Sequence, residues 1–167
     1  MGCNITELDQ LTRQLDYTGR RRRQRKVKLI EIDDREDRDG ITEILLAGMG
    51  YTPQRIRLPL GDFRWESPLG QVLVERKTPQ DARDINRFYK QFMRLTKASR
   101  EGGVFPILLI DHRPQKDEGL WEEFGLDNMC MSAQSVVRVA HCTQGQLAHR
   151  LDSIYQWTQK PKHDFVV

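Results

Sequence analysis

The sequence predicts an α/β domain in which helices flank both faces of a mixed β-sheet. Two observations lead to this fold class. Strand-like and helix-like patterns alternate along most of the chain, an order that favours a central sheet between helices. Residues 105–110 form an unbroken apolar run, which is typical of a strand buried on both faces. The chain has 167 residues, a length that fits one domain with a substantial core.

Three parts are expected along this chain. Residues 4–16 place apolar side chains at helical spacing, and the arginine-rich residues 19–26 contain no apolar side chain. We therefore expect an N-terminal helix and basic arm at 1–26, a folded domain at 27–159 and a C-terminal tail at 160–167. We interpret the arm as a phosphate-binding segment without base preference; a nuclear-import-like patch and a plain linker are the alternatives.

The first half of the folded domain is expected to hold one helix and four strands. Gly48 and Gly50 end the helix, whereas Gly61 and residues 67–70 have the composition of turns between strands. These signals give a strand at 27–32, a helix at 41–47, and strands at 56–60, 63–65 and 72–75.

The second half begins with a long amphipathic helix. Thr78 has the position of its N-cap, Pro79 that of its first residue, and Asp81 completes a capping box. The expected elements are a helix at 78–99, a strand at 105–110, a short helix at 119–124, a strand at 136–140 and a helix at 146–157.

Composition and missing motifs exclude several classes of protein. There are 27 basic and 24 acidic residues, so the net charge of +3 says little by itself about partners. The sequence lacks an apolar run long enough to span a bilayer, a secretory signal core, a phosphate-binding loop and a dinucleotide-binding glycine motif. Its 3 scattered cysteines favour reduced thiols. We expect an intracellular protein, in the cytoplasm or nucleoid or in a nucleus, that is not secreted and uses neither a membrane nor a nucleotide cofactor.

Three charged residues point to a chemical site. Asp62 lies between two predicted strands, and Glu75 and Lys77 share one face of the next strand because side chains two apart point the same way. A hairpin would bring the Asp62 and Glu75 carboxylates together, where they repel unless a cation lies between them. Paired carboxylates suit Mg²⁺ or Mn²⁺, and a nearby lysine stabilises charge on a water or a phosphate oxygen. These residues predict metal-assisted phosphodiester hydrolysis.

The alternative is that Glu75 and Lys77 form an edge-strand ion pair and that Asp62 is only a turn residue. The context argues against this alternative, because the apolar strand at 72–74 ends abruptly in three charges. A site at the carboxyl end of a strand explains such charges.

Four motifs, taken in order, give the sequence a specific resemblance. They are I-D-D-R-E at 32–36, G-D-F at 61–63, V-E-R-K-T-P-Q-D at 74–81 and R-F-Y-K-Q at 87–91. The set resembles the nuclease domain of XPF-type structure-specific endonucleases, which belong to the PD-(D/E)XK or restriction-endonuclease-like superfamily. The resemblance covers about residues 27–110 and implies a restriction-endonuclease-like sheet.

The resemblance implies roles for the matching residues. Metal ligands would be Asp62 and Glu75, with Asp33 completing the acidic cluster directly or through water. Lys77 would position and polarise the attacking water. The residues that would orient the ligands or a phosphate are Arg35, Glu36, Arg76 and Asp81. The expected catalytic set is Asp33, Glu36, Asp62, Glu75, Arg76 and Lys77, and the expected metal is Mg²⁺ or Mn²⁺. A solvated acidic loop is the competing interpretation of the acids at 33–39.

A basic stripe on the long helix is expected to contact DNA. The stripe consists of Arg83, Arg87, Lys90, Arg94 and Lys97. At a rise of about 1.5 Å per residue it spans about 21 Å, enough to follow several phosphates. With the residues added by the resemblance, the set expected to bind DNA is Arg35, Asp81, Arg83, Arg87, Tyr89, Lys90, Gln91 and Arg94. The alternatives are a solubilising face for the stripe and a helix cap for Asp81.

The predicted function is hydrolysis of phosphodiester bonds by a divalent-metal-dependent DNA endonuclease. By its resemblance, the chain would act on branched or junction DNA in repair or recombination and would pair into a homodimer through the nuclease domain. Two alternatives from other classes stay open. One is a catalytically silent module of the same fold that binds DNA or docks a partner, and the other is an interaction protein that blocks a host nuclease.

Overall fold

A computed structural model describes residues 27–36, 40–78, 81, 84–112, 131, 133–134, 136–143 and 145–161 of the chain. The N-terminal helix and basic arm predicted at 1–26 lie outside the described residues, as do the short helix predicted at 119–124 and Arg83. The same holds for the predicted tail beyond Pro161.

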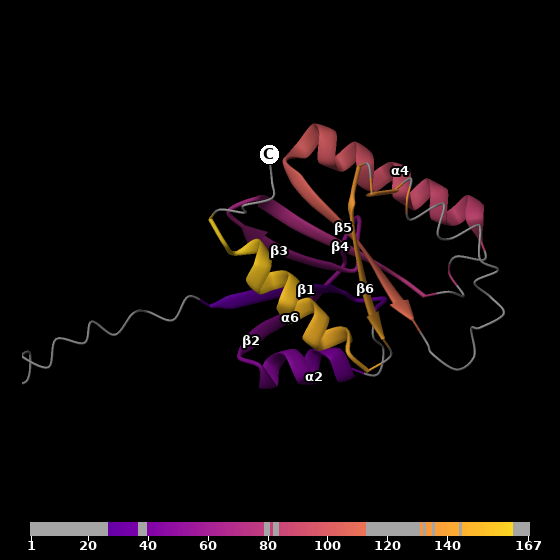
Figure 1. Ribbon diagram of the computed structural model, residues 1–167. Helices are drawn as coiled ribbons and strands as arrows, with labels where there is room; N and C mark the ends of the chain where they lie inside the picture. The colour runs from indigo at the N-terminus through magenta and orange to yellow at the C-terminus, as the bar shows by residue number, and fades with distance from the viewer. Residues whose placement is uncertain are drawn as a thin grey trace, which may run out of the picture.

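In the described part of the chain, six strands form one mixed sheet (Figure 1). They are β1 (Lys28–Asp33), β2 (Tyr51–Ile56), β3 (Phe63–Ser67), β4 (Gly70–Lys77), β5 (Val104–His112) and β6 (Arg138–Thr143). Their order across the sheet is β2-β1-β3-β4-β5-β6. β3 runs antiparallel to its neighbours β1 and β4, whereas the other pairs are parallel. The prediction of a mixed sheet is confirmed.

Helices cover both faces of this sheet, as predicted. α2 (Ile41–Gly48) and α6 (Leu147–Thr158) contact each other on one face, and α4 (Ile85–Gly102) lies on the opposite face against β5 (Figure 1). One buried cluster joins the sheet to α2 and α6, and a second joins α4 to β5. None of the helices in the described ranges has the length and apolar character needed to pass through a bilayer.

Alternation along β4 sends neighbouring charges to opposite faces of the sheet. Val72 and Val74 are fully buried in the cluster shared with α2 and α6. Because successive side chains of a strand alternate, Arg76 lies on that same face, whereas Glu75 and Lys77 lie on the α4 face. The three charges that end this strand therefore act in two different layers of the molecule.

One predicted strand is displaced along the chain. The strand expected at 56–60 is β2, which spans Tyr51–Ile56. Pro53 lies within β2, and a residue that lacks an N–H group is tolerated there because β2 is at the edge of the sheet. The residues predicted to be strand instead form the connection to β3, in which Leu58 is 1% exposed.

The start of the long helix also differs from the prediction. α4 begins at Ile85, and the Asp84 side chain caps it by accepting a hydrogen bond from Arg87 N at 2.9 Å. The predicted capping contacts nevertheless form upstream, where Thr78 N and Oγ1 both donate to Asp81 Oδ2, at 2.9 and 2.7 Å. The capping signal at Thr78 is thus real, although the long helix starts seven residues later.

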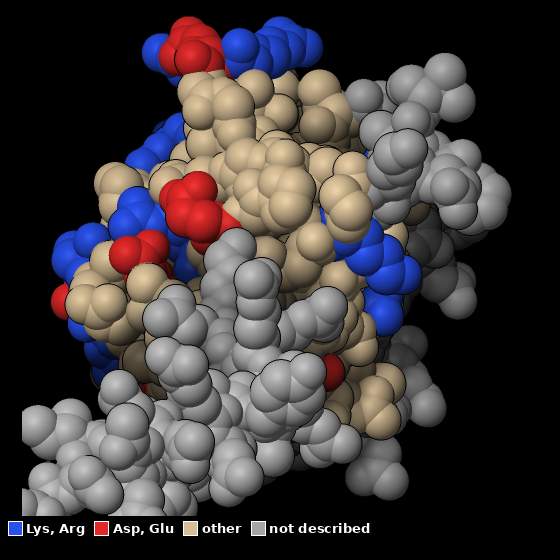
Figure 2. Space-filling model, turned by 90° about the vertical axis from the view of Figure 1, so that its left-hand side faces the viewer, with Lys and Arg blue, Asp and Glu red and all other residues tan. Residues whose placement is uncertain are grey.

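Basic side chains are unevenly distributed on the surface. On the face drawn in Figure 2, the described Lys and Arg residues lie toward the margins, and uncharged residues fill much of the area between them. A small net charge is thus compatible with local groups of basic side chains, and one such group lines a pocket at the end of β4.

Candidate active site

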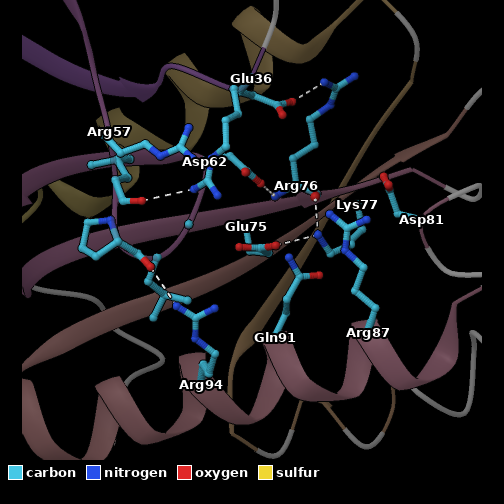
Figure 3. A pocket seen from close by; sticks show the side chains of 15 residues that line it. Glu36, Arg57, Asp62, Glu75, Arg76, Lys77, Asp81, Arg87, Gln91 and Arg94 are labelled. Carbon is cyan, nitrogen blue, oxygen red and sulfur yellow. Dashed lines mark hydrogen bonds and ion pairs between the residues drawn. The ribbon is translucent and has the colours of Figure 1, made fainter.

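A pocket of about 450 Å³ opens where the end of β4 meets the segment that leads into β3. α4 forms one wall, and the segments after β1 and β2 form others (Figure 3). The lining residues are Arg35, Glu36, Arg57, Leu58, Pro59, Leu60, Gly61, Asp62, Glu75, Arg76, Lys77, Asp81, Arg87, Gln91 and Arg94. Most of the residues that the sequence predicts as a site therefore meet here, although they come from separate stretches of the chain.

Backbone hydrogen bonds fix Asp62 beside the end of β4. Asp62 N donates to the carbonyl of Val74 at 2.8 Å, and Asp62 O accepts from Asp33 N at 2.9 Å, so the residue lies between β1 and β4. Its carboxylate then accepts a hydrogen bond from the backbone N–H of Arg76 at 2.7 Å. The Asp62 carboxylate is thereby held next to the residue that separates Glu75 from Lys77.

Gly61 allows the backbone to make this approach. Its φ is +77°, a conformation that side-chain-bearing residues rarely adopt, and an added Cβ would lie 2.7 Å from both Cγ and Cδ1 of Leu73. We expect Gly61→Ala to lower the free energy of unfolding by about 2 to 4 kcal/mol. Urea denaturation measures the change. The matched control is Gly48→Ala, where the Cβ meets nothing within 4 Å; equal stability of the two variants would contradict the prediction.

Glu75 and Lys77 form a buried ion pair on the wall that faces α4 (Figure 3). Glu75 is 3% exposed and Lys77 is 7% exposed. Lys77 Nζ donates to Glu75 Oε1 at 2.5 Å and to the carbonyl of Arg76 at 3.2 Å. Burying two charges is costly, so such a pair is weak support for stability and needs another explanation.

Asp62 lies in a buried part of the pocket, close to two other carboxylates. The pKa of Asp62 is raised to about 8, first by burial and then by the negative charges of Glu75 and Glu36. Among the described residues, hydrogen bonds occupy one carboxylate oxygen of Asp62 and one of Glu75, which leaves an oxygen of each for a ligand. Oxygen donors of this kind fit a hard divalent cation that keeps several waters.

A complete protein cage for a metal is absent from the part of the chain that the structure describes. No group of three or more His, Cys, Asp or Glu side chains there is arranged to hold an ion. Asp62 and Glu75 therefore fit a site in which water and a phosphate oxygen supply the remaining ligands, as Mg²⁺ commonly prefers.

Asp33, predicted as part of the acidic cluster, is not among the residues that line the pocket. Asp33 is 1% exposed, and Arg35 holds both of its carboxylate oxygens, through Nε at 2.6 Å and Nη2 at 2.8 Å. Leu58 N donates to Asp33 Oδ2 at 2.9 Å. The Arg35 guanidinium lowers the pKa of Asp33 to about 2. Both carboxylate oxygens of Asp33 are thus engaged by groups of the protein.

Glu36 and Arg76 belong to a second network. Arg76 Nη1 binds Glu36 Oε1 at 2.5 Å, while Arg76 Nε and Nη2 bind Asp111 Oδ2 at 3.0 and 2.5 Å. Glu36 lines the pocket, but the Arg76 guanidinium is already engaged by two carboxylates. Direct orientation of a phosphate by this guanidinium is therefore disfavoured by its contacts.

The predicted DNA-binding residues of α4 separate into two groups. Arg87, Gln91 and Arg94 line the pocket, and Arg94 Nη2 donates to the carbonyl of Pro59 at 2.8 Å. Tyr89 and Lys90 are exposed, yet they lie outside the pocket lining. Asp81 lines the pocket and also makes the capping contacts with Thr78.

Sequence reasoning missed two residues. Arg57 lines the pocket and binds Asp34 Oδ1 at 2.7 Å, but nothing in its sequence context distinguishes it from other exposed arginines. Asp111 is 3% exposed and ends the apolar run of β5. That position, an acid directly after a buried strand, was a signal that could have identified it.

Comparisons with known proteins agree with this architecture. Residues 32–135 match the ERCC4 domain. The fold is similar to that of XPF from Aeropyrum pernix in complex with DNA, with a TM-score of 0.64 and 21% identity over 83% of this chain and 68% of that chain. A second structure, XPF from Aeropyrum pernix, gives a TM-score of 0.59 and 22% identity over 83% of this chain and 65% of that chain. No curated protein matches the sequence.

This chain thus spans about two thirds of the length of these two structures, and at such identities the likeness concerns the fold. The family match rests on the sequence itself and covers more than half of the chain, including the motifs that line the pocket. The chain therefore belongs to the ERCC4 domain family.

Proposed function

We propose that this ERCC4 domain is a divalent-metal-dependent DNA endonuclease. The observation that carries the proposal is the convergence of Asp62, Glu75 and Lys77 in one pocket. Two carboxylates beside a buried ammonium group suit phosphodiester hydrolysis, in which a phosphate must be held and charge on it stabilised. The fold that the chain shares with XPF from Aeropyrum pernix supports the same class of function.

Asp62 and Glu75 would hold the cation through their uncommitted oxygens, with Glu36 as a further carboxylate of the same pocket. When bound, Mg²⁺ or Mn²⁺ would neutralise the paired carboxylates and polarise the scissile phosphate. Burial and the neighbouring Glu75 and Glu36 carboxylates raise the pKa of Asp62, and a bound cation would offset both effects.

Lys77 would orient the attacking water. Its ammonium group donates two hydrogen bonds within the protein, to Glu75 and to the Arg76 carbonyl, and so has a third N–H for a water or a phosphate oxygen. Because the side chain is only 9% exposed, its position is fixed by packing. A fixed positive charge in a poorly solvated pocket stabilises developing negative charge more than a surface lysine does.

Arginines on two sides of the carboxylates would bind the DNA backbone. Arg87 and Arg94 come from α4, whereas Arg35 and Arg57 come from the segments that follow β1 and β2. The side chains of Arg35 and Arg57 are 56% and 63% exposed, so part of each guanidinium stays accessible although each binds an aspartate. Contacts of this kind position a strand without reading its sequence.

Branched or junction DNA is the proposed substrate, in repair or recombination inside the cell. The complex of XPF from Aeropyrum pernix with DNA supports nucleic-acid binding by this fold. We also propose a homodimer formed through the nuclease domain. Light scattering tests the dimer, because the chain has a mass of 19.6 kDa and the dimer has twice that mass.

The test of the function is a gel assay of flaps, forks, four-way junctions and linear duplex with Mg²⁺, Mn²⁺ or EDTA. We expect wild-type protein to cut branched substrates with either metal, and we expect EDTA or Asp62→Asn to stop cleavage. Persistent cleavage in EDTA would refute the metal-dependent mechanism. Binding of DNA without cleavage under every condition would instead support the catalytically silent module.

Replacing both Arg87 and Arg94 with alanine should weaken DNA binding and flatten its salt dependence. Each lost phosphate contact lowers the slope of log K against log salt by about 0.9, so the double variant should lose about 2 units of slope. Fluorescence anisotropy over a salt series measures it. The control is Lys28→Ala with Arg138→Ala, which removes the same charge outside the pocket. If both pairs change the slope equally, α4 has no special role.

A further inference from the structure

The Arg76 side chain turns away from the face that carries its two neighbours. Glu75 and Lys77 lie toward α4, whereas Arg76 points to the side of the sheet that α2 and α6 cover. Figure 3 shows its guanidinium directed toward Glu36 and away from Gln91 and Arg87. The question is what holds an arginine in this place.

Asp111 holds it. The carboxylate lies at the end of β5, and Arg76 pairs in register with Leu109, so Asp111 is two residues further along the same face of the neighbouring strand. Arg76 Nε and Nη2 both donate to Asp111 Oδ2, at 3.0 and 2.5 Å. Its side chain is 4% exposed, against 19% for that of Arg76. The contact is therefore a buried, charge-assisted pair whose geometry the sheet register sets.

The same arginine reaches the pocket by two routes. Its Nη1 binds Glu36 Oε1 at 2.5 Å, and its backbone N–H binds Asp62 Oδ2 at 2.7 Å. Glu36 and Asp62 both line the pocket, and the charge of Glu36 contributes to the raised pKa of Asp62. The position of Arg76 thus affects two of the pocket's carboxylates, and Asp111 fixes that position from outside the pocket.

Stability alone explains this arrangement poorly. Within the described residues, Asp111 Oδ1 is buried and accepts no N–H or O–H hydrogen bond, which leaves it at most the weak thiol donor of Cys142. Cys142, the register partner of Asp111 on β6, contributes a thiol whose pKa is raised to about 11 by burial and by the Asp111 charge. Because a buried ion pair is often no more stabilising than an apolar pair of similar volume, we attribute this ion pair to a need for fixed geometry.

We propose that Asp111 is a positioning residue of the pocket: it fixes the Arg76 guanidinium, which in turn holds Glu36 at the pocket wall. This inference rests on the proposed nuclease function and extends it to a residue outside the pocket lining. Asp111 touches neither substrate nor cation and acts only through Arg76.

The first experiment compares Asp111→Asn with Asp152→Asn. Asp152 is a carboxylate on the same side of the sheet that accepts a hydrogen bond from the Tyr51 hydroxyl and lies outside the pocket. Partners that orient a metal site commonly change activity by about 10- to 100-fold. We expect Asp111→Asn to lower kcat for branched DNA by about that factor with KM unchanged, and Asp152→Asn to leave kcat unchanged. Equal effects of the two variants would overturn the inference.

The second experiment is a double-mutant cycle. If Asp111 acts through Glu36, adding Asp111→Asn to Glu36→Gln should cost little beyond Glu36→Gln alone. Glu43→Gln is the control background, because it removes a carboxylate that pairs with Arg55 outside the pocket. In that background Asp111→Asn should lower kcat by as much as it does in the wild-type protein. Additive losses in both cycles would show a general structural role. If Asp111→Asn does not fold, Arg76→Lys takes its place, because one ammonium group keeps the charge but not the fork that joins Glu36 to Asp111.

A third measurement separates this inference from the proposed function. Mn²⁺ binding to the folded protein, followed by electron paramagnetic resonance, needs no DNA cleavage. We expect Asp111→Asn to weaken Mn²⁺ binding about tenfold relative to Asp152→Asn. If wild-type protein binds Mn²⁺ but cuts no DNA, the nuclease proposal fails and the Mn²⁺ result still decides the role of Asp111. Equal Mn²⁺ affinity in both variants, or none in wild-type protein, overturns the inference.

Discussion

Replacing Lys77 with alanine is expected to reduce DNA cleavage about 100- to 1,000-fold while leaving DNA affinity within about twofold, an effect on the order of that seen when a transition-state donor is removed. The physical reason is the position of its ammonium group, which lies 2.5 Å from Glu75 Oε1 inside the pocket. No other Lys lines the pocket, among the residues that the structure describes, so no neighbouring ammonium group can replace it. Single-turnover cleavage of a flap or fork measures the rate, and anisotropy without metal measures the affinity.

The matched control is Lys28→Ala. Lys28 begins β1, at the opposite end of that strand from Asp33, and its ammonium group lies 4.6 Å from the centre of the Tyr51 ring. Both variants lose one positive charge, but only Lys77→Ala loses it inside the pocket. A thermal melt verifies that each variant is folded. Cleavage by folded Lys77→Ala at the wild-type rate would remove Lys77 from the mechanism.

Asp33→Asn is expected to lower the free energy of unfolding at neutral pH by about 3 kcal/mol. Arg35 lowers the pKa of Asp33 to about 2 from a usual value of 3.8, and a shift of that size corresponds to about 2 kcal/mol. The remainder comes from the amide group, which turns a donor toward the Arg35 and Leu58 donors that the carboxylate accepts. Urea denaturation without metal measures the difference.

The pH dependence of this difference has a defined sign. Because the pKa of Asp33 is lower in the folded state than in the unfolded chain, its stabilising effect is complete above about pH 5 and is lost as pH falls from about 4 to about 2. The gap between wild type and Asp33→Asn should therefore close in acid. Asp34→Asn is the control, because its exposed pair with Arg57 contributes little. Unchanged stability with lost Mn²⁺ binding would restore Asp33 as a metal ligand.

These expectations show how the sequence and the structure contribute differently to the site. The motifs predicted that Asp62, Glu75 and Lys77 act together, and the pocket brings them together. They also place Asp33 among the metal ligands, directly or through water, and this stays a prediction; a motif records residue types and order but not which oxygens other groups of the protein bind. The hydrogen bond from Leu58 to Asp33 depends on tertiary packing, and the one from Arg35 depends on the conformation of its side chain. Residue spacing in the sequence predicts neither of them.

The boundaries of helices and strands were likewise predicted only in part from the sequence. Hydrophobic patterning predicted the helices on both faces and the buried strand β5, because burial on one or two faces leaves a period in the sequence. It misplaced β2, since Pro53 is tolerated only because that strand lies at the edge of the sheet. Whether a strand is at an edge or in the centre depends on pairing with distant segments, which local propensity does not include.

By itself the sequence determined the fold class, the order of most elements and the charged triplet that ends β4, because periodicity, capping and residue type are local properties. Strand alternation already placed Arg76 on the opposite face from its neighbours, but the tertiary structure alone decided that it meets Asp111, 35 residues later in the chain. It alone decided as well that Arg57 reaches the pocket and that Tyr89 does not line it. Such contacts depend on strand register and on the packing of α4 against β5, both of which are set only when the whole sheet assembles.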